Sequence, residues 1–288
     1  MKKHVNIFLA LAVVLSFTAC EKVVQLNVKN DEPIVIINSQ LTNNLEKWQV
    51  DLTLTQPYFD QSDITTIEDA EVTITDSDGV TDTLFHSGDG FYQTRALKKC
   101  EVGKSYTLSV KYNGEEYTAT EACYYQDTID FIKSYYLPER NGFIPEGYYV
   151  FQKSKEHEPD GDFYRWRIIK NDVDMVDTVG YLLDDDEFRS TGFFNINIDS
   201  ANPLKDIDRG VYPRPFPLNF DLGDNVRIEQ FRISEAYYNF LNGFATQQQR
   251  AGTPFDPPPS NPRSNIQGGA YGFFSVVNIS GKEIVVTE

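Results

Sequence analysis

Residue types that commonly carry out chemistry are sparse in this chain. Beyond the first twenty residues there are two histidines, His86 and His157, and neither has a second histidine or a cysteine at the spacing of a zinc site. No Gly-x-Ser-x-Gly sequence is present to hold a serine nucleophile. A glycosidase needs two carboxyl groups set across a sugar; carboxylates are abundant enough to form such a pair anywhere in the chain, so a carbohydrate-active enzyme is the weaker alternative. The sequence therefore predicts a protein that is not an enzyme and has no cofactor.

The densest acidic run is Asp184, Asp185, Asp186 and Glu187. Calcium is bound by several oxygen ligands, so a run of carboxylates is a candidate calcium site. The spacing of an EF-hand loop, with its central glycine and terminal glutamate, is missing. A solvated loop is the favoured interpretation, and calcium is the alternative.

Two cysteines, Cys100 and Cys123, flank a hairpin signal at Asn113-Gly114. Pairing of the strands on either side of that turn places Cys123 opposite Lys104, a few residues from Cys100. A disulfide is then feasible, provided that the chain before Gly103 folds back. The alternative is two unpaired thiols buried as small hydrophobic side chains.

A third cysteine, Cys20, ends a leader segment. Lys2 and Lys3 precede the apolar run from Ile7 to Phe17, and a small residue, Ala19, comes directly before the cysteine. This order is typical of a secretory signal, and the apolar run is too short to span a bilayer. A cysteine in this place resembles a bacterial lipobox, so residues 1–19 are predicted to be removed and Cys20 to be acylated. An ordinary cleaved signal with an incidental cysteine is the alternative.

The segment after the anchor is short. Residues 20–30 contain no stretch rich in glycine and serine, and at about 3.3 Å per extended residue they reach on the order of 30 Å. We therefore expect the folded body to stay close to the membrane.

The mature chain is strongly acidic. Removal of the signal leaves 24 basic and 43 acidic residues, a net charge of −19. Such a surface is repelled by phosphate backbones, so nucleic acid is not expected as a partner. The 40% hydrophobic content is ample for a folded core.

Residues 22–126 read as a run of short strands without a helical period, and residues 31–126 of this run are the first predicted domain. Alternation of apolar and polar residues is clear at residues 50–54 and 106–110, and turn signals separate the strands. This pattern predicts an immunoglobulin-like β-sandwich. The expected strands are 23–28, 33–41, 48–55, 70–75, 81–85, 91–95, 106–112 and 115–120.

Residues 127–288 predict a second β-rich domain that carries one helix, so the fold class is mainly β. Ser234 can cap the helix, expected near 234–251, and Tyr237, Phe240, Leu241 and Phe244 recur at helical spacing. The expected strands of this half are 128–136, 148–153, 163–169, 175–182, 193–198, 226–233, 270–277 and 283–286. Gly268 to Phe274 lacks the Lys-Ser/Thr of a phosphate loop, so this segment is interpreted as structural.

Aromatic doublets are the best indication of binding. In a strand one member of each pair faces outward, where it offers flat apolar area to a sugar, a peptide or a protein. The alternative is that loops or the other domain cover both members. The doublets are Tyr124-Tyr125, Tyr135-Tyr136, Tyr148-Tyr149, Tyr237-Tyr238 and Phe273-Phe274.

The order of several short motifs resembles a known family over nearly the whole chain. It is a Bacteroidota lipoprotein family catalogued as a domain of unknown function and often encoded beside outer-membrane TonB-dependent transporters. The Cys100 and Cys123 pair is not part of its pattern, and it has no settled catalytic residues to carry over. The motifs are Cys20-Glu21-Lys22, Asp69-Ala70-Glu71-Val72, Gly103 to Leu108, Phe163-Tyr164-Arg165, Leu222 to Val226, Asn261 to Ile266, Gly268-Gly269 and Gly272-Phe273-Phe274.

This resemblance implies an outer-membrane lipoprotein held in the lipid bilayer by acylated Cys20. It also implies a β-barrel transporter as partner, which the chain assists in nutrient capture or uptake. The alternative is a surface adhesion or structural module of the cell envelope. The sequence leaves open whether the body faces the periplasm or the cell exterior.

Overall fold

The computed structural model describes residues 32–57, 63–126, 128–139, 145–154, 162–175, 182–185, 218–248 and 261–288. Residues 33–56 and 62–288 form one compact unit, and the description below concerns that unit. The described part is mainly β, as predicted, with one helix, α4 (Glu235–Gln248). None of the described helical residues forms an apolar helix long enough to cross a membrane.

Most of the described strands are short, and β14 is the longest of them. They are β1 (Val35–Thr42), β2 (Gln49–Leu54), β3 (Glu71–Asp76), β4 (Thr81–Gly88), β5 (Phe91–Gln93), β6 (Ser105–Tyr112), β7 (Glu115–Ala122), β8 (Ile129–Leu137), β9 (Gly147–Ser154), β10 (Phe163–Lys170), β11 (Val173–Asp174), β12 (Leu182–Asp185), β13 (Asn225–Ile233) and β14 (Tyr271–Val285).

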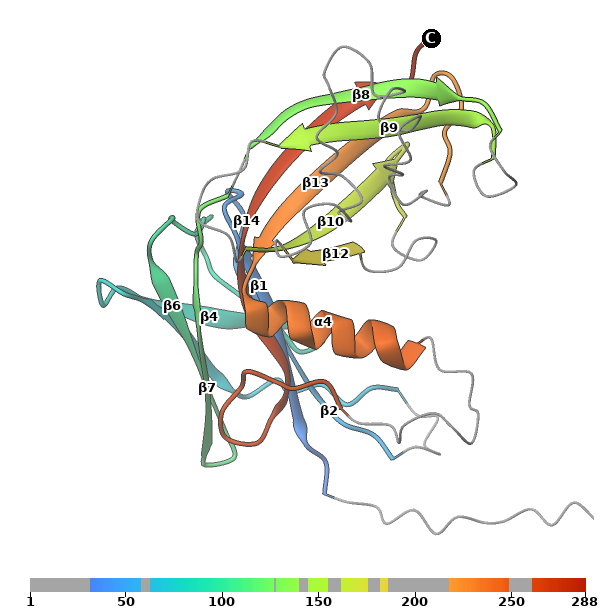
Figure 1. The fold of residues 1–288 in the computed structure, drawn as a ribbon. Helices are drawn as coiled ribbons and strands as arrows, with labels where there is room; N and C mark the ends of the chain where they lie inside the picture. The colour runs from blue at the N-terminus through green and yellow to red at the C-terminus, as the bar shows by residue number, and fades with distance from the viewer. Residues whose placement is uncertain are drawn as a thin grey trace, which may run out of the picture. The chain divides into compact units, whose positions relative to one another are not determined.

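Hydrogen bonding joins twelve of these strands into one mixed sheet. Its order is β11-β10-β13-β14-β1-β2-β5-β4-β3-β6-β7, with β12 paired to β10, while β8 and β9 form a separate two-stranded sheet. Figure 1 traces β14 in red between β1 and β13. The structure therefore shows a mainly β fold with one continuous path of strands; the predicted sandwich and the division at residue 126 are not shown by this pairing.

Strand β14 accounts for that continuity. Its first half, Tyr271 to Val277, pairs in parallel with β1, and its second half, Asn278 to Val285, pairs antiparallel with β13. The sequence predicted two strands here, 270–277 and 283–286, and that prediction is wrong. Asn278, Ser280 and Gly281 lie between the two predicted strands, but Asn278 is buried and all three stay in the ladder with β13.

The predicted alternation is confirmed in the core of the first strands. Tyr106, Leu108 and Val110 of β6 are buried together with residues of β1 to β5 and with Phe274 of β14. Each fully buried apolar side chain contributes about 1.5–3 kcal/mol. A second cluster packs Val150 of β9 against the inward side chains of β10 and β13.

The hairpin at Asn113-Gly114 forms as expected, with both residues at positive φ, 49° and 83°. It sets the predicted register, because the Cys123 amide donates to the Lys104 carbonyl at 2.9 Å. The Sγ atoms of Cys100 and Cys123 lie 2.7 Å apart as buried free thiols. The neighbouring Cys123 thiol and burial raise the pKa of Cys100. The disulfide stays a prediction.

The glycine-rich segment before β14 is packed against its neighbours. Asn265 receives a hydrogen bond from the Phe274 amide at 3.0 Å and donates to the Phe274 carbonyl at 2.8 Å. A Cβ at Gly268 would lie 2.7 Å from the Glu116 carbonyl oxygen. The structural interpretation of this segment agrees with these contacts.

Several predicted elements lie outside the described residues. They are the strands 23–28 and 193–198, most of the strand 175–182, and the helix end at 249–251.

Candidate functional site

A row of four side chains crosses the sheet on the face opposite the core. Phe91 of β5 pairs with Asp51 of β2, Asp51 with Asn38 of β1, and Asn38 with Phe273 of β14. Side chains at paired positions share a face, and neighbouring strands lie about 4.8 Å apart. The row therefore places an aromatic ring at each end, a carboxyl and an amide between them, and a length of about 14 Å between the outer strands.

Polar side chains flank this row on the side toward the ends of β1 and β5. Gln40 of β1 pairs with Ser275 of β14, and Gln49 of β2 pairs with Gln93 of β5. The Gln93 amide donates to the Gln49 Oε1 at 2.7 Å, which fixes this pair. The strand period of two thus creates a patch of amides on the outer face.

Helix α4 forms one wall above the sheet. Ser234 caps it as predicted, because its Oγ accepts a hydrogen bond from the Tyr237 amide at 3.2 Å. Tyr237 and Phe240 both pack on Phe273, with ring centroids 4.9 Å apart in each case. On the other side of the helix, Tyr238 packs on Phe163 of β10 at 5.1 Å. These contacts hold the helix over β14.

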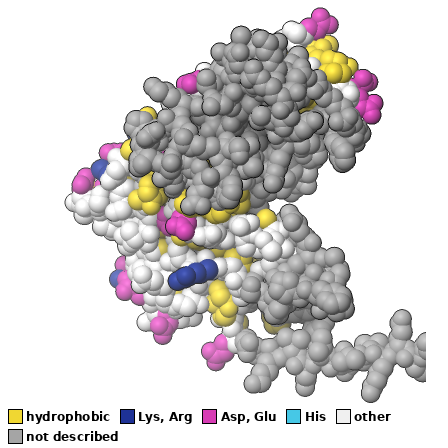
Figure 2. Space-filling model, viewed as in Figure 1, with side chains coloured by type: hydrophobic (Ala, Val, Ile, Leu, Met, Phe, Trp, Pro, Cys, Tyr) yellow, Lys and Arg dark blue, Asp and Glu magenta, His cyan; other side chains and the backbone are white. Residues whose placement is uncertain are grey.

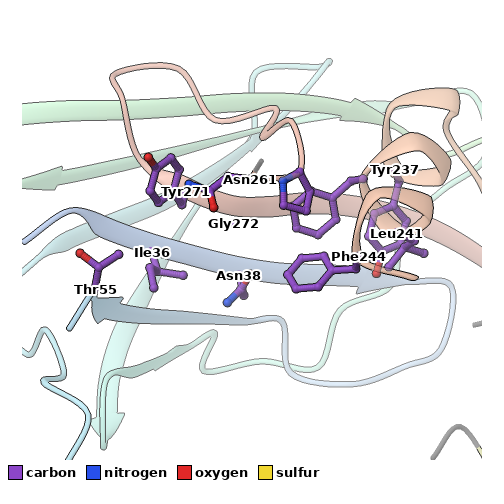
Figure 3. A pocket seen from close by; sticks show the side chains of 11 residues that line it. Ile36, Asn38, Thr55, Tyr237, Leu241, Phe244, Asn261, Tyr271 and Gly272 are labelled. Carbon is purple, nitrogen blue, oxygen red and sulfur yellow. The ribbon is translucent and has the colours of Figure 1, made fainter. Parts of the chain in front are cut away.

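Two adjoining cavities open between the helix and the sheet. Their volumes are about 560 Å³ and 390 Å³, within the range of ligand sites in proteins. They share Asn38, Tyr237 and Phe240, so we treat them as one groove and call it the α4 groove. Figure 3 shows Asn38 on the strand side and Tyr237, Leu241 and Phe244 on the helix side. The described lining residues are Ile36, Asn38, Ser39, Gln40, Gln49, Asp51, Thr55, Phe91, Tyr237, Phe240, Leu241, Phe244, Asn261, Pro262, Tyr271, Gly272, Phe273 and Ser275.

The polar groups in the middle of the α4 groove are available to a ligand. Among the described residues, the side chains of Asn38, Gln40 and Asp51 have no hydrogen-bond partner. Burial raises the pKa of the Asp51 carboxyl above its ordinary value. A polar group that loses water without gaining a partner costs free energy, so these side chains favour a ligand that can hydrogen bond to them.

The charge of the α4 groove is low. Asp51 is the one charged side chain among the described lining residues, which include no lysine, arginine or histidine. Elsewhere on the described surface, Figure 2 shows acidic side chains in magenta at several separate places.

The structure describes part of the acidic run that was singled out in the sequence. Asp184 and Asp185 belong to β12, where they pair with Tyr164 and Phe163, so these two lie in a strand and not in the predicted loop. Asp186, Glu187 and Cys20 lie outside the described residues. The described part of the chain holds no group of three or more side chains suited to a metal ion, and the calcium alternative is not tested by it.

Two of the aromatic doublets divide between two faces as the strand and helix periods require, whereas Tyr124 and Tyr125 are both exposed and lie outside any strand. Phe273 lines the α4 groove while Phe274 is in the core, although both are nearly fully buried, with 3% and 0% of their surface exposed. Tyr237 and Tyr238 separate in the same way around the helix. Sequence reasoning missed Asn38, Gln40 and Asp51; the available signals were the alternation of polar and apolar residues in β2 and the polar run Asn38-Ser39-Gln40 inside the apolar strand β1.

No curated protein and no solved structure matches the chain. A model of a family described as a domain of unknown function, DUF4249, matches residues 21–283. This match covers most of the 288 residues, so the chain belongs to the DUF4249 family.

Proposed function

We propose that the chain is a lipid-anchored, non-enzymatic binding protein of the outer membrane that assists a TonB-dependent transporter in nutrient capture. The observation that carries the proposal is the α4 groove, which combines a ligand-sized volume with three polar side chains that lack a partner among the described residues. A groove of this kind binds a ligand through its walls and orients it through its few polar groups.

The lining favours binding over turnover. Cleavage of a glycosidic bond uses two carboxyl groups facing each other across the sugar, and Asp51 is the single carboxyl among the described lining residues. The groove can therefore hold a ligand without supplying the acid and base that would break it.

The location rests on the leader. Lys2, Lys3, the apolar run to Phe17 and the Ala19-Cys20 pair support removal of residues 1–19 and acylation of Cys20. One acyl chain binds a membrane weakly and several bind it firmly, since each buried methylene contributes about 0.8 kcal/mol. With the short segment 20–30, such an anchor would keep the groove beside membrane proteins such as a β-barrel transporter.

The finer description of the fold belongs to the same proposal. We infer an immunoglobulin-like sandwich for residues 31–126, supported by one buried cluster that brings together inward side chains of strands distant in the pairing order, including Ile37 of β1 and Val110 of β6. A division into this part and residues 127–288 is proposed with it.

Two measurements on the same cells test the proposal. Labelled palmitate should enter the wild-type protein and not the Cys20→Ala variant, and the wild type solubilised in mild detergent should bring a β-barrel protein with it. Absence of label, with the polypeptide released into the medium, would overturn the anchor. Repeated recovery of the labelled lipoprotein alone would reject the transporter and favour a surface adhesion or structural module.

A further inference from the structure

We propose that the α4 groove binds a neutral oligosaccharide. The inference rests on the proposed function for its biological setting, because it names the class of nutrient that the groove would capture. Its physical basis is the lining alone: aromatic faces at the ends, unpartnered amides and one carboxyl in the middle, and no cationic side chain among the described lining residues.

Aromatic side chains provide flat apolar area on both sides of the α4 groove. Phe273 itself, at the β14 end of the row, is covered by Tyr237 and Phe240, so other rings are the accessible ones there. Phe91 is 36% exposed on one side, while Tyr271 and Phe244 are 37% and 42% exposed on the other. The faces of a pyranose ring carry C–H groups, which pack on an aromatic face in the same way as other apolar groups. Rings spaced along a groove therefore suit a chain of sugar units.

The middle of the row provides the polar contacts. The Asn38 amide has donors and an acceptor, and the Asp51 carboxylate is an acceptor on the neighbouring strand at the paired position. A sugar hydroxyl both donates and accepts, so two adjacent hydroxyls can satisfy the two side chains together. Gln40, two residues along β1 on the same face, extends this contact to a further hydroxyl.

The same lining disfavours other ligand classes. A phosphate or carboxylate ligand would meet Asp51 and no cation among the described lining residues, in a chain of net charge −17. A lipid chain or other purely apolar ligand would bury the Asn38 and Gln40 amides without hydrogen bonds, which costs free energy for each group. A neutral ligand rich in hydroxyl groups avoids both costs.

The length of the groove indicates more than one sugar unit. The row from β5 to β14 spans about 14 Å, and the larger cavity continues along β1 toward Ile36 and Thr55. A monosaccharide would contact one aromatic wall at a time, whereas an oligosaccharide reaches both walls and the amides between them.

Calorimetric titration of the full-length protein in detergent micelles tests the inference. The probes are four neutral hexasaccharides, made of glucose with α-linkages, glucose with β-linkages, xylose and mannose, with hexagalacturonic acid as the acidic counterpart. We expect at least one neutral probe to bind and the acidic probe to bind about tenfold more weakly or not at all.

Variants locate the binding. Phe91→Ala and Asn38→Ala should each weaken binding by about 3- to 10-fold, because each removes a wall or a hydrogen-bonding group. Tyr125→Ala, which changes an exposed aromatic residue outside the groove, is the matched control and should leave affinity unchanged. Asp51→Asn preserves the side-chain shape. It gives a second measurement of affinity for a groove variant if Phe91→Ala fails to fold.

The results separate this inference from the proposed function. No binding of any neutral probe at about 5 mM, equal binding of the acidic probe, or unchanged affinity in the groove variants would overturn the oligosaccharide site. If the sugar binds at the groove and no transporter is recovered with the protein, the site stands and the transporter association fails. If the transporter is recovered and no sugar binds, the transporter association stands and the oligosaccharide site fails.

Discussion

Among the described glycines, Gly272 is the one at which an added methyl group should damage the fold most. It lies in β14 opposite Ile37 of β1, with φ at +97°. A Cβ there would overlap the Ile37 carbonyl oxygen and lie 2.8 Å from the carbonyl carbon. Because those atoms belong to the backbone of the neighbouring strand, the contact cannot be relieved by a side-chain rotation.

The magnitude of Gly272→Ala can be worked out from two contributions. Holding alanine at positive φ costs about 1–2 kcal/mol. Separating β1 from β14 enough to admit the methyl group sacrifices two or three ladder hydrogen bonds, at about 1 kcal/mol each. The sum is about 3–5 kcal/mol, which corresponds to a fall in melting temperature of roughly 6–20 °C for a domain of this size.

Gly269→Ala is the matched control for this measurement. Its φ is +90°, but no atom lies within 4 Å of the added Cβ. This variant should lose only the conformational contribution of about 1–2 kcal/mol. Urea denaturation followed by circular dichroism compares the two variants, and equal losses of stability would refute the close approach of β14 to β1.

Three further predictions concern buried polar groups. Burial raises the pKa of Glu121, so the folded state keeps the Glu121 proton to higher pH than the unfolded chain, and stability is lost as pH rises through the folded-state pKa. Glu121→Gln should remove this loss in thermal denaturation from pH 4 to 8; melting temperatures of the two proteins that change in parallel with pH would contradict the prediction. Asp162→Asn leaves the buried Arg232 guanidinium without its anion, and should cost about 2–3 kcal/mol in urea denaturation, less than a fully buried pair loses; a loss below about 0.5 kcal/mol, as for exposed pairs, would speak against it. Oxidation of Cys100 and Cys123 to a disulfide closes a loop of 23 residues and should add about 3 kcal/mol relative to the reduced protein; two alkylatable thiols in protein isolated without reductant would exclude the bridge.

The features that the sequence predicted correctly are local ones. Asn113-Gly114 specifies its turn because the two residues tolerate positive φ, and Ser234 specifies the helix start because its hydroxyl reaches an amide three residues away. Tyr106, Leu108 and Val110 face inward because the strand period is two. Each of these depends on residues within a few positions of one another.

The α4 groove depends on pairs that are distant in the chain. Ser39 and Ser275, which are 236 residues apart, are joined by a hydrogen bond of 3.3 Å across the β1 and β14 pair. The alternation of residues within a strand does not indicate which strands will be neighbours in the sheet. The pairing of Asn38 with Phe273 could therefore not be predicted. The same limitation explains why the sequence predicts two strands in place of β14. The continuity of β14 comes from its pairing with β1 along its first half and with β13 along its second half.

The central place of the last strand affects how the polypeptide reaches its native state. Until β14 (Tyr271–Val285) has been synthesised, one edge of β1 has no partner strand, and the ladder of β10 and β13 is not joined to the rest of the sheet. Such non-local pairing slows folding, because loop closure must precede most of the stabilising contacts. A copy of the chain that stops before β14 exposes the open edge of β1, which can pair with another chain and aggregate.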